Sequence, residues 1–312
     1  MKKNILLFFI FIAASYTAEA QRGQIDTLIF KYVPPADTVK YWSTGGAISM
    51  NIRSVFLTDW TKGGNSNISL GSNLNLFANK KKNRHTIDLK LDAGFGIMRE
   101  GDANYKFKKN NDFIIFIGKY SEQVIKKWYL TGMLDTRTQF AKGYRYFMQA
   151  GEEQRELRSN FLSPITLLPS LGFSLKEKAF SVTVSPISGK FTIYNNDSLA
   201  RLANLPPGQN VLSEAGPSLS ISDKRTIFKE SEIRYNILMF SRFSRVVYHW
   251  DIQGELYMRF KVHKYVSLIY THLLIYDDAN KLRRDDDTSY VPWQQNQMIN
   301  IGFTMDIFSK EK

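Results

Sequence analysis

The sequence predicts an all-β fold, an antiparallel transmembrane β-barrel of about twelve strands. Apolar and polar residues alternate with a period of two along repeated segments, which is the pattern of a strand with two different faces. Short and long connections between these segments alternate, and an export signal precedes them. Aromatic residues are abundant, with 16 Tyr and 22 Phe, as expected for the aromatic girdles of such barrels.

The clearest strand covers residues 248–261. Its even positions are apolar, with Trp250 and Phe260 near the two ends and aliphatic residues between them. Its odd positions are polar and include Asp251, Glu255 and Arg259. A membrane-spanning barrel strand has this pattern, with an apolar face toward lipid and a polar face toward the lumen.

Twelve segments are expected to form strands. They are 44–57, 66–78, 84–98, 110–120, 127–142, 163–176, 179–188, 214–223, 229–242, 248–261, 265–277 and 296–308. Segment 110–120 is apolar throughout, so the pattern does not assign its two faces. Pro217 predicts a strand start or a bulge within 214–223.

The lengths of the connections support closure into a barrel. With the N-terminus in the periplasm, the periplasmic turns should be short, and those at 80–83, 121–126, 177–178, 224–228 and 263 are short. The three longest connections, 143–162, 189–213 and 278–295, all fall at the opposite end. Short periplasmic turns and long outer loops are typical of outer-membrane barrels.

The N-terminus resembles a signal peptide. Lys2 and Lys3 precede an apolar run at 5–14, and Ala18-Glu19-Ala20 forms a cleavage site. The run is too short for a membrane anchor, and no later run reaches the length of a transmembrane helix. The predicted organisation is a signal peptide at 1–20, a periplasmic lead-in at 21–43, a barrel at 44–308 and a tail at 309–312, located in the outer membrane.

The predicted lumen is narrow and charged. Twelve strands imply a bore of roughly 12 Å inside the side chains. These charges could pair into a plug or line a conducting pore, and the sequence leaves both open. The side chains expected to point inward are Arg53, Asp88, Lys90, Asp92, Asp135, Arg137, Glu232, Arg234, Asp251, Glu255 and Arg259.

Five short motifs resemble, in their order, a family of secreted barrel proteins of Gram-negative bacteria that is known only as a domain of unknown function. The resemblance covers about residues 40–308 and implies an outer-membrane β-barrel without an assigned activity or catalytic residues. The chain departs from common outer-membrane barrels because four residues follow Phe308. The motifs are Asp59-Trp60-Thr61-Lys62-Gly63-Gly64, Thr138-Gln139-Phe140 with Gly143-Tyr144, Phe161-Leu162-Ser163-Pro164, Ser185-Pro186-Ile187-Ser188-Gly189-Lys190 and Ile275-Tyr276-Asp277-Asp278.

Candidate chemical sites are weak. His249 and Asp251 share one strand face, but no Ser stands in a nucleophile elbow, so a lumen network is favoured over a hydrolase. His263 and His272 are expected near strand ends, in structural roles.

The acidic group Asp277, Asp278, Asp285, Asp286 and Asp287 lacks EF-hand spacing, so a solvated loop is favoured over a calcium site. The run 185–190 lacks a phosphate-loop pattern. Trp60 and Gly63-Gly64 are read as a girdle aromatic and a turn. We therefore expect no catalytic, cofactor or metal site.

The net charge of +13 is spread over strands and turns, which argues against nucleic-acid binding. Without Cys there is no disulfide framework. The predicted partners are outer-membrane lipid, the barrel assembly machinery and, for an open lumen, a small solute. The sequence predicts a porin-like channel or transporter for small solutes, or a structural barrel, and not an enzyme. The alternatives are an outer-membrane enzyme of phospholipase type and a surface adhesion or partner-binding protein.

Overall fold

The computed structural model describes residues 42–55, 67–100, 105, 107–228, 231–243, 250–277, 282–283 and 289–308. The predicted signal peptide at 1–20, most of the lead-in and the tail at 309–312 lie outside these ranges and stay predictions. So do the turn with Trp60 and Gly63-Gly64, the residue His249, and most of the acidic segment 278–288. Among the described residues, no helix has the length and hydrophobicity of a membrane span.

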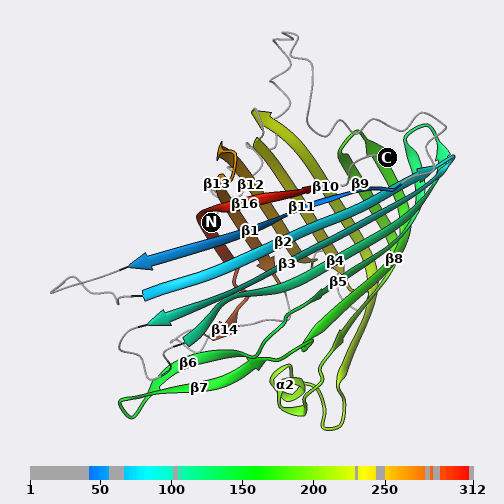
Figure 1. The fold of residues 1–312 in the computed structure, drawn as a ribbon. Helices are drawn as coiled ribbons and strands as arrows, with labels where there is room; N and C mark the ends of the chain where they lie inside the picture. Colours follow the sequence, from blue (N-terminus) through cyan, green and yellow to red (C-terminus); the bar gives the residue numbers. More distant parts are fainter. Residues whose placement is uncertain are drawn as a thin grey trace. The chain divides into compact units, whose positions relative to one another are not determined.

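Twelve antiparallel strands close into a barrel, which confirms the predicted fold (Figure 1). The first strand, β1, pairs with the last, β16, from Gly45↔Phe308 to Asn51↔Gly302. The ring order is β1-β16-β13-β12-β11-β10-β9-β8-β5-β4-β3-β2. The strands are β1 (Ser43–Val55), β2 (Asn67–Lys82), β3 (His85–Glu100), β4 (Phe107–Ile125), β5 (Trp128–Thr138), β8 (Ile165–Glu177), β9 (Phe180–Ile193), β10 (Val211–Phe228), β11 (Ser231–Ser241), β12 (Trp250–His263), β13 (Val266–Tyr276) and β16 (Gln294–Phe308).

Several strands are longer than the alternation predicts. β4 extends beyond the expected 110–120, and β10 beyond 214–223. The alternation becomes irregular in these added parts, but backbone pairing continues there because a ladder does not need a regular apolar face. The short connections therefore tighten to two residues, such as Asn83-Arg84 and Lys126-Lys127, and this end of the barrel is called the turn end.

Pro217 lies at an irregularity inside β10, as predicted. The register between β10 and β9 shifts between Gly216 and Ser218, so the missing amide of proline falls where the ladder is already broken. Gly216 is required at the same point, because a Cβ atom there would lie 1.7 Å from the carbonyl oxygen of Ser241. The absence of a side chain at residue 216 thus lets β10 lie close to the backbone at the end of β11.

All three long connections contain secondary structure that the sequence does not predict. Residues 143–162 hold a hairpin of β6 (Gly143–Gln149) and β7 (Glu152–Ser159). Residues 189–213 are partly strand, and they also contain the short helix α2 (Asp197–Leu202), whose N-terminal amides are capped by the side chain of Asn196. The third contains the two-residue strands β14 (Leu282–Arg283) and β15 (Ser289–Tyr290). We call this end of the barrel the loop end.

The outer wall of the barrel is apolar and exposed. Met50 and Ile52 on β1 are 53% and 70% exposed, and Phe303 on β16 is 72% exposed. Ile187 on β9 is 68% exposed. Large apolar side chains rarely gather on a surface that faces water, so the inner and outer faces have the inverse polarity of a soluble protein.

Candidate functional site

The interior of the barrel carries the charged residues that alternation assigns to it. Ion pairs join them to one another or to further inner residues, including pairs between strands that are not neighbours in the ring. The side chain of Arg53 lies outside the described part. The predicted inner residues with ion pairs are Asp88, Lys90, Asp92, Asp135, Arg137, Glu232, Arg234, Asp251, Glu255 and Arg259.

One ion pair crosses the interior. Arg137 on β5 donates from Nη1 to Glu255 Oε1 on β12 at 2.8 Å. These strands are five steps apart one way around the ring and seven steps the other way. Arg137 also donates from Nε and Nη2 to the two carboxylate oxygens of Asp135, at 2.8 and 3.2 Å. Its planar guanidinium thus joins opposite walls through three hydrogen bonds.

The bridge continues toward a third wall. Lys90 on β3 pairs with Asp92 and lies 4.0 Å from Glu255. Asn75 on β2 donates to Asp92 Oδ1 at 2.7 Å. The network therefore extends from β2 and β3 through β12 to β5, and its members hold each other at fixed positions inside the barrel.

An apolar cluster lies beside the Arg137 and Asp135 end of this bridge. Its members come from β4, β5, β8 and β11, and they are between 2% and 8% exposed. β4 contributes inward residues from the segment whose faces the sequence left unassigned: its inner face is as apolar as its outer face. The cluster is Ile115, Ile117, Met133, Leu168, Leu238 and Phe240, with Phe113 packed against it.

Buried hydroxyl groups bind the strands of one wall. Thr131 donates to Ser121 at 2.9 Å, and Ser174 donates to Thr131 at 2.8 Å. Ser174 also shares a 2.8 Å hydrogen bond with Thr183. These hydrogen bonds run from β4 through β5 and β8 to β9. Small polar side chains therefore join the inner faces of four neighbouring strands.

A second ionic network lies toward the loop end. Lys190 on β9 is 2.6 Å from Asp251 and 3.6 Å from Glu214. Arg242, which follows β11, contacts Glu214 and lies 3.5 Å from Asp251. Because Asp251 is engaged by two cations, it is not placed as the carboxylate of a catalytic triad. The other expected member, His249, lies outside the described residues.

The inner charges toward the turn end are more exposed. Lys176 on β8 is 2.8 Å from Asp88 on β3, and the Asp88 side chain is 39% exposed. Lys224 on β10 is 3.2 Å from Glu232 and is 40% exposed. Solvent therefore reaches inner charges here, whereas Arg137 is only 14% exposed.

In the described part of the chain, the remaining candidate residues do not come together as a binding or catalytic site. Within the described ranges, no group of three or more His, Cys, Asp or Glu residues could hold a metal ion. The run 185–190 belongs to strand β9 and not to a loop. His263 ends β12 as expected, but His272 lies within β13, so its predicted place near a strand end is wrong.

The β6–β7 hairpin is fixed to neighbouring residues by cations. Arg155 lies over the rings of Tyr105 and Tyr144, at 4.6 and 4.5 Å. Lys108 on β4 donates to Glu153 at 2.6 Å. Burial raises the pKa of the Tyr146 phenol, although Arg155 and Lys108 oppose this rise. The hairpin is therefore braced against the chain beside β4, and it exposes Phe147 and Met148.

Sequence reasoning missed the inner partners Lys176, Lys190, Glu214 and Arg242. Lys176, Glu214 and Arg242 stand at the ends of predicted strands, and the alternation of these strands could have placed them. Lys190 lies beyond the predicted strand 179–188, where the alternation no longer assigns a face.

Comparison with known proteins gives a partial family match and no assigned activity. Residues 52–144 match the model of a family described as "Protein of unknown function (DUF3078)", which confirms the resemblance over less than a third of the chain. No curated protein sequence matches the chain.

Solved structures with similar folds are distant. An outer membrane channel from Pseudomonas putida F1 is 8% identical, with a TM-score of 0.38, covering 91% of this chain and all of that one. The translocator domain of the autotransporter NalP from Neisseria meningitidis is 12% identical, with a TM-score of 0.34, covering 84% and 87%. An anion-selective porin from Comamonas acidovorans is 8% identical, with a TM-score of 0.30, covering 86% and 99%.

Proposed function

We propose that this chain is an outer-membrane β-barrel that is closed at rest and anchors a structured surface at its loop end. The observation that carries the proposal is the Arg137–Glu255 pair, which crosses the interior between opposite walls at 2.8 Å. Together with the apolar cluster, it favours a plugged or structural barrel over a permanently open pore.

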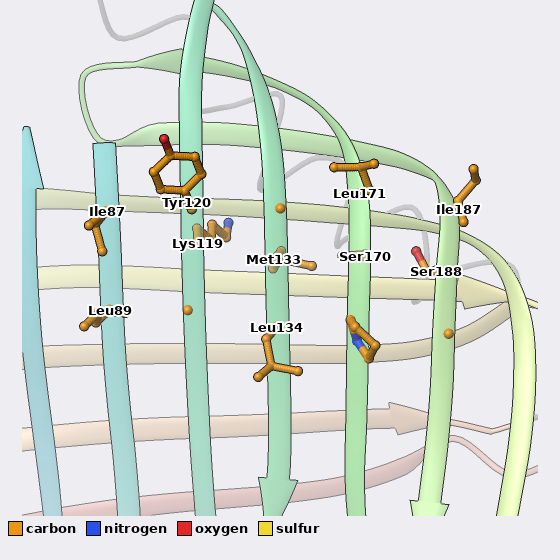
Figure 2. Close-up of a pocket in the computed structure, with 14 residues that line it drawn as sticks. Ile87, Leu89, Lys119, Tyr120, Met133, Leu134, Ser170, Leu171, Ile187 and Ser188 are labelled. Carbon is orange, nitrogen blue, oxygen red and sulfur yellow. The ribbon is translucent and has the colours of Figure 1, made fainter. Parts of the chain in front are cut away.

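The outer wall supports a place in a membrane. A shallow depression of about 620 Å³ runs over β3, β4, β5, β8 and β9, and its outward-facing lining is apolar (Figure 2). Leu171 and Ile187 stand on this wall, and Tyr120 lies toward its turn end. Such an apolar surface suits contact with lipid chains. The closed ring also leaves no strand edge unpaired, as a membrane-spanning sheet requires.

The loop end supports a surface role. Its hairpin is fixed by Arg155 and Lys108, so its shape is set before any partner arrives. Phe140, Met148 and Phe161 are exposed there, at 43%, 69% and 54%. Preformed aromatic surface is favourable for binding because little conformational freedom is lost on contact. A partner-binding protein is therefore favoured over an outer-membrane phospholipase.

A second candidate is a gated pathway for small solutes. This candidate is supported by the inner charges Asp88 and Lys224, whose side chains are exposed toward the turn end. Opening such a path would require the Arg137–Glu255 bridge to separate.

Reconstitution into planar bilayers tests the closed state. The wild-type protein should insert, shift its gel migration on heating and carry no steady current. Steady conductance would overturn the closed barrel, and absence from the membrane fraction would overturn the location. Conductance that appears only in Glu255→Gln would support the gated pathway.

A further inference from the structure

Basic side chains encircle the turn end of the barrel. Each described two-residue turn at the turn end carries at least one lysine or arginine. We call these residues with their strand-end neighbours the turn collar: Lys80, Lys82, Arg84, Lys126, Lys127, Lys178, Arg225 and Lys264. Three acidic residues, Glu122, Glu177 and Asp223, accompany these eight basic ones at the outer rim, so the collar is positive.

Two collar lysines occupy a backbone conformation that lysine rarely adopts. Lys126 has φ 42° and Lys178 has φ 54°, both in the left-handed region. Asparagine and glycine tolerate this region better than lysine does. The equivalent position of the β2–β3 turn is Asn83, with φ 52°. The chain thus places lysine at two turns where its backbone conformation alone would favour asparagine.

The collar lies at the level of exposed aromatic rings. Lys80 Nζ is 5.5 Å from the ring centre of Trp42, and Lys264 Nζ is 5.0 Å from that of Tyr265. Trp42 and Tyr265 are 41% and 51% exposed, and Trp128, next to Lys127, is 52% exposed. Exposed Trp and Tyr at the end of an apolar wall mark the headgroup region of a membrane.

We propose that the turn collar binds the anionic headgroups of phospholipids in the leaflet that surrounds the turns. The positive charge and its position among interfacial aromatics together favour lipid phosphate over a soluble acidic polymer. The inference rests on the proposed membrane location. It adds a lipid preference, and it accounts for part of the positive net charge of the chain.

The test replaces the two strained lysines with the residue that the turn favours. Lys126→Asn with Lys178→Asn removes two charges, and the variant should fold at least as well as the wild type. Lys142→Asn with Arg145→Asn removes the same charge from exposed residues at the loop end, and it is the matched control. Spin-labelled phosphatidylglycerol and phosphatidylcholine, each in phosphatidylcholine bilayers, report the relative association of the two headgroups with the protein.

The wild type should prefer phosphatidylglycerol, and added salt should weaken this preference. In the collar variant, the preference for phosphatidylglycerol should fall by up to roughly fivefold per lysine at the sites beside these turns. The loop-end control should keep the preference of the wild type.

An inserted wild type without preference, or an unchanged collar variant, would overturn the inference and leave the membrane location standing. Failure of the wild type to insert would overturn both. Binding of soluble polyglutamate without a lipid preference would assign the collar to an acidic polymer and overturn the lipid proposal.

Discussion

Removing either member of the Arg137–Glu255 pair should destabilise the barrel by different amounts. In Glu255→Gln, Arg137 keeps both hydrogen bonds to Asp135 and loses one charged hydrogen bond of 2.8 Å. Such a bond contributes about 1.5–3 kcal/mol. The side chains of Arg137 and Glu255 are only 14% and 19% exposed, so water screens the loss weakly.

The reverse change is more severe. In Arg137→Gln, Asp135, whose side chain is 4% exposed, loses its guanidinium partner, and Glu255 loses its shortest contact. Leaving a buried carboxylate without its cation costs about 3–5 kcal/mol. Arg137→Gln should therefore cost more than Glu255→Gln. The double variant should cost less than the sum, with a coupling of about 0.5–3 kcal/mol.

Urea unfolding of the protein in phosphatidylcholine vesicles, followed by tryptophan fluorescence, measures these free energies. The matched control is the pair Lys127 and Glu177, which has a similar distance of 2.6 Å but side chains 57% and 53% exposed. Its neutralisation should leave the free energy of unfolding nearly unchanged, because solvent screens the exposed pair. Equal losses for Arg137→Gln and Glu255→Gln, or a coupling near zero, would refute the bridge across the interior.

Three further predictions concern the outer wall, the close backbone contact at Gly216 and the β6–β7 hairpin. Met50→Arg on the exposed wall should cost about 2–4 kcal/mol in a bilayer, whereas Val124→Arg near the turn end should cost about 0–1 kcal/mol; equal unfolding free energies would contradict the membrane depth of these positions. Gly216→Ala should cost about 1–3 kcal/mol because its Cβ meets a backbone carbonyl; Gly132→Ala, with nothing within 4 Å, is the control, and an equal effect would refute the close contact. Arg155→Leu should speed proteolysis within the β6–β7 hairpin while the barrel stays intact, and an unchanged cleavage rate would show that the cation does not brace it.

The sequence predicts the twelve strands because lipid and lumen impose opposite polarity on successive residues. This constraint is visible in single strands such as β12, where Trp250 to Phe260 alternate without interruption. The pattern is not visible in β4, because its inward residues Ile115 and Ile117 belong to the apolar cluster. Inward and outward positions of β4 are then both apolar, and the sequence does not distinguish them. The β6–β7 hairpin was missed because β7 is polar on both faces apart from Leu157, so alternation does not mark it as a strand.

The contacts inside the barrel could be predicted only in part. Alternation assigns Arg137 and Glu255 to the interior, but they are 118 residues apart in the sequence. Whether they meet depends on the stagger of the strands around the ring, which no local pattern reveals. The choice between a plug and a pore therefore needed the three-dimensional arrangement.

Labelling of β12 tests the central claim, that alternate residues face lipid and a closed interior. The chain has no cysteine, so single cysteines at Glu255, Leu256, Tyr257 and Met258 can each carry a fluorophore without a competing label. In bilayers that contain brominated lipid, fluorophores at Leu256 and Met258 should be quenched, and those at Glu255 and Tyr257 should not. Equal quenching at all four positions, or none at any, would contradict a membrane-spanning barrel with this register.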